Sequence, residues 1–152
     1  MRGFDDADFH ARRDRAQDLM AQEKLAALLL TTEPEIRYYT GFQTQFWESP
    51  TRPWYLILPA TGDPIAVIPS IGAALMGRSW VRDIRTGRAP DLEDDGVTLL
   101  IATLKDVAQG GAVGIADGME SHARMPLASL YAVRGAVDLG GDKAITRRLR
   151  RI

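Results

Sequence analysis

The chain has 152 residues, 45% of them hydrophobic and 26% charged, which is typical of a globular domain with one core. Its 19 basic and 20 acidic residues give a net charge of −1, so no excess of charge favours nucleic acid or a polybasic membrane contact. The absence of cysteine excludes disulfides, thiolate metal sites and a cysteine nucleophile. The longest apolar runs, LAALLL and VTLLIATL, are far shorter than the ~20 residues that span a bilayer. We therefore expect a cytoplasmic protein with no membrane partner.

The first forty residues predict a helix, a buried strand and a helical turn. Residues 8–24 place Phe9, Ala16, Leu19 and Met20 on one side of an amphipathic helix. Acidic residues precede this helix, where carboxylates cap the first turn and complement the helix dipole. Residues 25–31 (LAALLLT) are apolar on both faces, as in a strand covered by helices on both sides. Residues 33–42 then predict a single helical turn.

Residues 40–54 (TGFQTQFWESPTRPW) form an irregular segment that we call the aromatic loop. Pro50 and Pro53 each remove a backbone donor and favour extended geometry in the residue before them, so a long helix is excluded here. Phe42 and Trp54 adjoin predicted elements, and we expect both rings to lie in the core.

The middle of the aromatic loop holds the candidate contact residues Phe46, Trp47 and Arg52. In one interpretation the rings fold back and cover one end of the sheet. In the other, rings and an arginine between Gly41 and two prolines form a contact surface, since loops with this composition often carry recognition. The residues alone leave both interpretations open.

The remainder of the chain alternates strands and helices. The predicted elements are a hairpin at 54–69, a helix at 70–80, a strand at 81–86, a helix at 97–108, a strand at 112–116, a helix at 125–136, a strand at 137–139 and a helix from 143. Ser70 is the expected N-cap of the first of these helices, and Asp94 or Asp95 caps the second. This order predicts an α/β domain with three layers around a mixed sheet.

No motif in the chain specifies catalysis. His10 and His122 are the only histidines, and neither belongs to an H-E-x-x-H pattern. Ser121 adjoins His122, but no orienting acid is evident, so a hydrolytic dyad is not favoured. The glycines of QGGAVGIADG precede a strand and lack the G-K-[ST] of a phosphate loop. Three aspartates are candidates for nuclease-like carboxylates at strand ends, although their spacing specifies no metal pair: Asp83, Asp117 and Asp138.

Segments spread over the whole chain combine into a family pattern. The most specific piece is IRYYTGF at residues 36–42, which is followed by PWYLILPATGDPIAVIP and VRDIRT. Together with DDGVTLL and ESHARMP, these segments resemble the N-terminal domain of the creatinase, aminopeptidase P and prolidase superfamily. The resemblance runs from about residue 8 to the end of the sequence.

The resemblance implies a ribonuclease-H-like fold of the three-layer α/β/α type over residues 1–143. Residues 144–152 would begin a linker helix to a C-terminal catalytic domain, which in relatives holds the metal pair (Mn, Co or Zn) and the catalytic histidines. It therefore implies no catalytic residue, metal or cofactor in this chain, and a parent protein that is a metal-dependent hydrolase of Xaa–Pro peptides or of creatinase-like C–N substrates.

The resemblance also implies partners. They are the chain's own catalytic domain and further copies in a homo-oligomer, with no nucleic acid. The aromatic loop matches the region that relatives lend to the substrate pocket of a neighbouring subunit, so Phe46, Trp47 and Arg52 are the implied contact residues. The alternative is a stand-alone binding or oligomerisation module derived from the same family.

Overall fold

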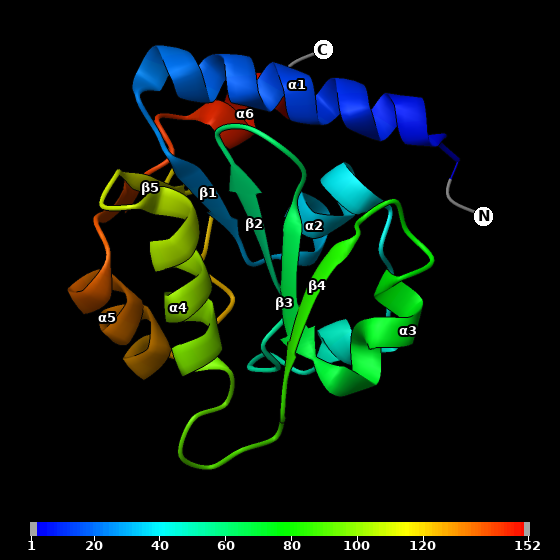
Figure 1. The fold of residues 1–152 in the computed structure, drawn as a ribbon, viewed down its shortest axis with the longest axis vertical. Coiled ribbons are helices and arrows are strands. Elements are labelled where there is room, and N and C mark those ends of the chain that lie inside the picture. Colours follow the sequence, from blue (N-terminus) through cyan, green and yellow to red (C-terminus); the bar gives the residue numbers. More distant parts are fainter. Residues whose placement is uncertain (1–2, 151–152) are drawn as a thin grey trace.

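A mixed six-stranded sheet forms the centre of residues 3–150, the part of the chain that the computed structural model describes (Figure 1). The strands are β1 (Ala27–Leu30), β2 (Tyr55–Pro59), β3 (Ile65–Pro69), β4 (Asp83–Gly87), β5 (Val113–Ile115) and β6 (Leu139–Gly141), in the spatial order β4-β3-β2-β1-β5-β6. Strand β2 is antiparallel to β1 and β3, whereas the β1–β5, β5–β6 and β3–β4 pairs are parallel. The hairpin and the mixed sheet predicted from the sequence are confirmed.

Helices cover both faces of this sheet. They are α1 (Asp6–Glu23), α2 (Glu33–Thr40), α3 (Ala73–Met76), α4 (Val97–Ala108), α5 (Leu127–Ala136) and α6 (Ile145–Arg150). Alternate strand side chains point to opposite faces. Leu28, Leu56 and Ile68 pack with α1, α2, α3 and α6, whereas Leu29 and Ile57 pack with α4 and α5. The three-layer α/β/α architecture is therefore confirmed.

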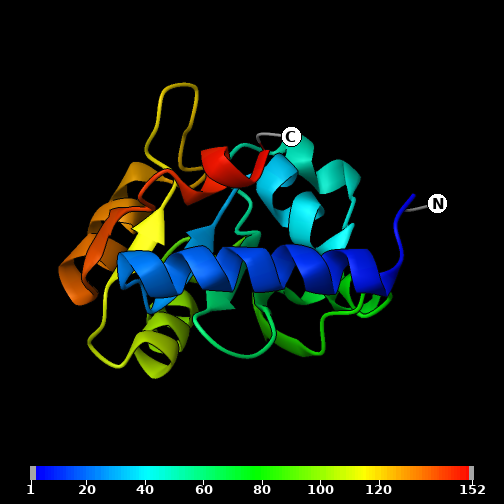
Figure 2. The ribbon, with the colours of Figure 1, turned by 90° about the horizontal axis from the view of Figure 1, so that it is seen from above.

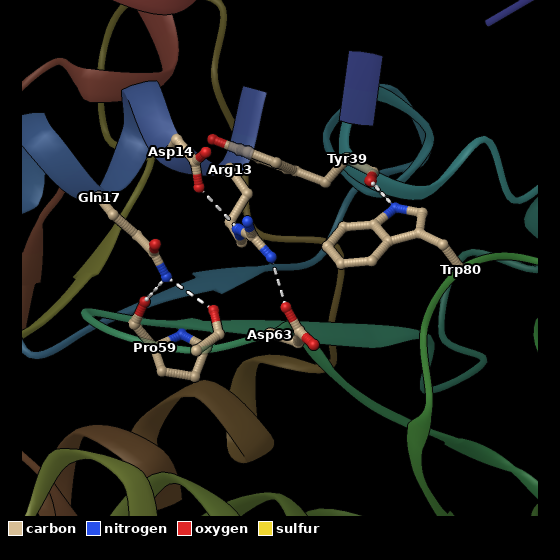
Figure 3. Close-up of polar contacts among 8 residues, drawn as sticks. Arg13, Asp14, Gln17, Tyr39, Pro59, Asp63 and Trp80 are labelled. Atoms are coloured by element: carbon tan, nitrogen blue, oxygen red, sulfur yellow. Dashed lines mark hydrogen bonds and ion pairs between the residues drawn. The ribbon is translucent and has the colours of Figure 1, made fainter. Parts of the chain in front are cut away.

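Helix α1 lies across one end of the sheet with α6 beside it (Figures 1 and 2). Its first turn is capped as expected, because the side chains of Asp5 and Asp8 each accept the backbone N–H of the other. Figure 3 shows how the helix holds the turn between β2 and β3: Gln17 donates to the carbonyl oxygen of Pro59 (3.0 Å) and Arg13 pairs with Asp63. Within residues 3–150 no helix is long and apolar enough to cross a membrane.

Local capping explains where the elements differ from the predictions. Helix α2 extends over eight residues instead of one turn. Its start is capped by the carboxylate of Glu35, which accepts the N–H groups of Thr31 (3.1 Å) and Thr32 (3.0 Å), and it ends at Gly41 in a left-handed conformation. The prediction that Ser70 is an N-cap is wrong: Ser70 belongs to a 3-10 turn, and α3 begins only at Ala73.

The later elements also differ slightly from their predicted bounds. The carboxylate of Asp94 accepts the N–H of Thr98 (2.8 Å) in the first turn of α4, as expected of one of the two aspartates, although Gly96 occupies the N-cap position. Strand β6 begins two residues later than predicted, since Val137 still serves as the C-cap of α5.

The division at residue 143 stays a prediction. The side chain of Ile145, in α6, is fully buried against α1 and α2. Four residues of the predicted segments 1–143 and 144–152 lie outside the described part of the chain: Met1, Arg2, Arg151 and Ile152.

Candidate functional site

The aromatic loop lies at the end of the sheet opposite to α1. Strands β1 and β5 end there and β2 begins there, because β1 is parallel to β5 and antiparallel to β2. The loop after β4 reaches the same place, since Pro53 and Gly96 line one shallow apolar hollow together with Tyr55 and Leu99. The carboxyl ends of parallel strands are where α/β sheets commonly bind ligands. This end of the sheet is therefore the candidate site.

Four rings of the aromatic loop pack into one cluster. Phe46 stacks on Trp54 with the ring centroids 6.2 Å apart, and Phe42 meets the ring of Trp47 edge-on at 6.3 Å. Phe42 is 3% exposed and Trp54 is 1% exposed, so the prediction that both belong to the core is confirmed. The cluster gives the loop a rigid base on the sheet.

The three predicted contact residues lie on the outer side of this cluster. Phe46 and Trp47 are partly exposed and pack against the core with their inner surfaces. Arg52 is also partly exposed, and its side chain forms no hydrogen bond or ion pair within residues 3–150, whereas its carbonyl oxygen accepts two hydrogen bonds. The three side chains are therefore partly packed on the core and partly accessible to solvent. Their role in binding stays a prediction.

Arg124, a residue that the sequence interpretation did not single out, holds the middle of the loop. Its guanidinium donates to the carbonyl oxygens of Arg52 (2.7 Å) and Ser49, and its central carbon lies 4.8 Å from the centroid of the Trp47 ring. Its backbone N–H donates to Oγ1 of Thr31 (3.0 Å), directly after β1. These partners are 72 to 93 residues away in the sequence, so no local signal marks them.

The electrostatic environment of Arg124 is set by burial. The side chain is inside the fold and forms no ion pair with any carboxylate of residues 3–150. Desolvation lowers the pKa of Arg124, while Tyr55 and Glu33 act in the opposite direction. Burial is also the main reason that the pKa of Tyr55 rises to about 12. Neither group offers a proton donor or acceptor that titrates near neutral pH.

The other candidates from the sequence do not come together. His10 lies on α1 with its ring against Trp80, at the far end of the sheet. Ser121 and His122 are both exposed, and no hydrogen bond joins them. The three candidate aspartates, Asp83, Asp117 and Asp138, form no shared site: within residues 3–150 no group of three or more histidine, aspartate or glutamate side chains is placed to hold a metal ion.

Solved structures with the same fold come from longer hydrolases and from isolated domains. The chain matches dipeptidase PepE from Mycobacterium ulcerans with 27% identity and a TM-score of 0.73, covering 97% of this chain and 38% of that one. A recombinant prolidase from Thermococcus sibiricus has 18% identity and a TM-score of 0.76, with 95% and 37% covered, so the chain spans less than two fifths of either protein.

A third structure corresponds to this chain almost from end to end. It is the Creatine_N superfamily domain of a dipeptidase from Streptococcus thermophilus, with 11% identity, a TM-score of 0.70 and coverage of 91% of this chain and 98% of that one. At such low identity the likeness shows the fold alone. Among curated proteins none matches the sequence significantly. The sequence profile of the Creatinase/Prolidase N-terminal domain matches residues 12–152, and the chain therefore belongs to the creatinase/prolidase N-terminal domain family.

Proposed function

We propose that this chain is the non-catalytic N-terminal domain of a metal-dependent dipeptidase of the prolidase type, and that its aromatic loop forms part of the substrate pocket. The observation that carries the proposal is the aromatic loop itself, which presents two half-buried rings and an arginine side chain that forms no hydrogen bond or ion pair within residues 3–150. Dipeptidases and a prolidase among proteins of the same fold support the choice of reaction.

The chemistry of the three side chains suits a small peptide substrate. Phe46 and Trp47 would form an apolar wall, since large rigid rings exclude water at little entropic cost. The planar fork of Arg52 would hold the terminal carboxylate of a dipeptide through two parallel hydrogen bonds. Such a wall would limit the length of the peptide that fits.

The hydrolytic metal pair belongs to another domain in this proposal. The described residues offer no cluster of ligands for Mn, Co or Zn, so no step of the hydrolysis is assigned to them. We propose that the partners are the chain's own catalytic domain and a second copy, whose pocket the loop reaches in a cytoplasmic homo-oligomer. The alternative is a stand-alone binding module. A reading frame that continues past Ile152 into a catalytic domain supports the first proposal, and a stop codon there supports the second.

Arg52 provides the test of the pocket. In the full-length protein, Arg52→Ala should lower kcat/KM for an Xaa–Pro dipeptide by about ten- to a hundredfold, the value of a charge-assisted hydrogen bond. The C-terminal amide of the same dipeptide lacks the carboxylate, so the variant should hydrolyse it as the parent protein does. Arg134→Ala, at an exposed position of α5, is the matched control. An unchanged preference for the free carboxylate in Arg52→Ala would refute the assignment.

The purified chain alone should hydrolyse no Xaa–Pro peptide and no creatine, with or without added Mn²⁺, Co²⁺ or Zn²⁺. The physical reason is that a catalytic metal needs several convergent ligands. Metal-stimulated turnover that a chelator abolishes would contradict the non-catalytic role.

A further inference from the structure

Arg124 is a buried cation, 9% exposed, that forms no ion pair within residues 3–150, although Glu33 acts on its charge from a distance. Removing an unpaired cation from water costs free energy, and hydrogen bonds to two carbonyl groups recover only part of that cost. A methionine would avoid this cost, but it would leave the carbonyl oxygens of Ser49 and Arg52 without their donor. The contacts of Arg124 with the aromatic loop are therefore what offsets the cost of burying its charge.

The aromatic loop has few backbone hydrogen bonds of its own in the part that Arg124 contacts. Between Pro50 and Trp54 the structure has one backbone–backbone hydrogen bond, from the N–H of Trp54 to the carbonyl oxygen of Arg52. Both prolines lack an N–H. Arg124 donates to the carbonyl oxygen of Ser49, directly before this stretch, and to that of Arg52, in its middle.

We propose that Arg124 is the positioning residue of the aromatic loop. Its two hydrogen bonds fix the backbone at Ser49 and Arg52, and thereby set the direction in which the Arg52 side chain leaves the loop. The central carbon of its guanidinium lies 4.8 Å from the centroid of the Trp47 ring, and this contact holds that ring in place. Its own backbone is anchored at Thr31, so the loop is aligned with the end of β1.

A planar guanidinium is needed for this arrangement. Its fixed fork can donate to two carbonyl groups and face an aromatic ring at the same time, whereas the ammonium of lysine is a single point charge. The effect on the loop follows from the contacts described here. The consequence for substrate binding rests on the proposed function.

The test uses the three tryptophan indole N–H resonances of the 152-residue chain. In Arg124→Met the Trp47 resonance should shift. The amide of Trp54, which donates to the carbonyl oxygen of Arg52, should exchange with deuterium at least about tenfold faster, because Arg124 no longer fixes that carbonyl group. The Trp80 resonance should stay in place, since its N–H donates to Tyr39 (2.8 Å) at the far end of the sheet. The melting temperature should fall by only a few degrees, because two loop carbonyl groups lose their donor while the cost of burying a charge is removed.

Two further variants sharpen the result. Arg124→Lys should give intermediate exchange rates, and full recovery of the parent rates would refute the need for the planar fork. Arg134→Met, which removes an exposed charge from α5, should leave the Trp47 resonance unchanged. The inference is overturned if Arg124→Met leaves both the Trp47 resonance and the exchange rates unchanged, or if it perturbs Trp80 and the whole core equally.

The functional consequence is measured separately. In the full-length protein, Arg124→Met should weaken the preference for a free substrate carboxylate in the same direction as Arg52→Ala, mainly through a higher KM. If Arg52→Ala leaves that preference intact while Arg124→Met still loosens the loop, the proposed function fails and the positioning role stands. If the loop is unaffected in Arg124→Met, the positioning role fails whatever Arg52 does.

Discussion

Gly72 shows how one missing side chain sets the position of the aromatic cluster. A Cβ atom built on Gly72 would overlap the six-membered ring of Trp54, and its backbone φ of −91° is one that any residue adopts. The requirement for glycine is therefore one of space and not of backbone conformation. Trp54 in turn supports the rings of Phe42 and Phe46.

Replacing Gly72 by alanine should destabilise the fold by about 1–3 kcal/mol, as overpacking of a core does. The matched control is Gly135→Ala in α5, where nothing lies within 4 Å of the added Cβ. That change should stabilise the protein by about 0.5–1 kcal/mol, because alanine favours a helix over glycine. Urea unfolding of the two variants measures both effects. If Gly72→Ala changed the free energy of unfolding by as much as Gly135→Ala and in the same direction, the Trp54 ring would have moved aside without a loss of stability.

Substitution of Trp47 distinguishes a packing role of the aromatic loop from a role in substrate recognition. Because its ring is only partly buried, Trp47→Ala should lower the free energy of unfolding by about 2 kcal/mol, less than the ~3–5 kcal/mol of a fully buried aromatic. In the full-length protein the same variant should lower kcat/KM for the dipeptide. The two measurements on one variant decide between the interpretations. If Trp47→Ala lost ~3–5 kcal/mol of stability and its kcat/KM were unchanged, the loop would serve only to cover the core.

At the scale of elements, helix α1 holds the hairpin turn through side chains. Gln17 donates from one amide nitrogen to the carbonyl oxygens of Pro59 and Gly62, at 3.0 and 2.8 Å (Figure 3 labels Gln17 and Pro59). Arg13 adds ion pairs to Asp14 and Asp63, and its hydrogen bond to Asp14 is the main reason that the pKa of Arg13 is raised. Those pairs are largely at the surface, where ion pairs contribute little.

Gln17→Ala should therefore reduce the free energy of unfolding by about 1–2 kcal/mol, the typical value for hydrogen bonds of this kind. Gln22→Ala, at an exposed position of the same helix, provides the control for helix propensity and should change stability by less than about 0.5 kcal/mol. Chemical denaturation compares the two variants directly. If they do not differ, water replaces the amide of Gln17 without loss.

The elements that the sequence predicts best are those whose signals are local. The spacing of Phe9, Ala16 and Met20 predicts that one side of α1 is buried, and the uniformly apolar run of β1 predicts that this strand is buried on both faces. Both predictions follow from neighbouring residues alone, and both residue sets are buried. The start of α2 also has a local signal that the prediction missed, since Thr32 and Glu35 form a capping box in which the Glu35 carboxylate accepts two N–H groups before the helix. Arg124 is a harder case, because its contacts exist only after β1, the aromatic loop and the loop after β5 have met in space.

At the scale of the whole molecule, the sheet joins two apolar layers into one unit. Strands β1, β2 and β3 contribute alternate side chains to the clusters on both faces. Neither layer can lose its packing without exposing strands that the other layer also uses. We therefore expect thermal unfolding of the 152-residue chain to be a single cooperative transition.

Buried tyrosines make that unfolding sensitive to alkaline pH. Burial raises the pKa of Tyr55 to about 12, with Asp95 adding to the shift and Arg124 opposing it, and burial raises the pKa of Tyr39 as well. In the unfolded chain a tyrosine loses its proton near pH 10. Above that pH the unfolded state therefore holds fewer protons than the folded state, so stability is complete below pH 10 and falls as the pH rises toward 12.

The free energy of unfolding should fall by up to about 1.4 kcal/mol per pH unit for each buried tyrosine above pH 10. Tyr55→Phe removes one of the two ionisations, so the slope that they cause should be roughly halved between pH 10 and 11.5. Tyr131→Phe, at an exposed position of α5, should leave the slope as in the parent chain. Urea unfolding at several pH values gives the slope for each variant. Identical slopes in Tyr55→Phe and the parent chain would mean that the Tyr55 hydroxyl is ionised equally easily in both states, and that this end of the sheet is open to water.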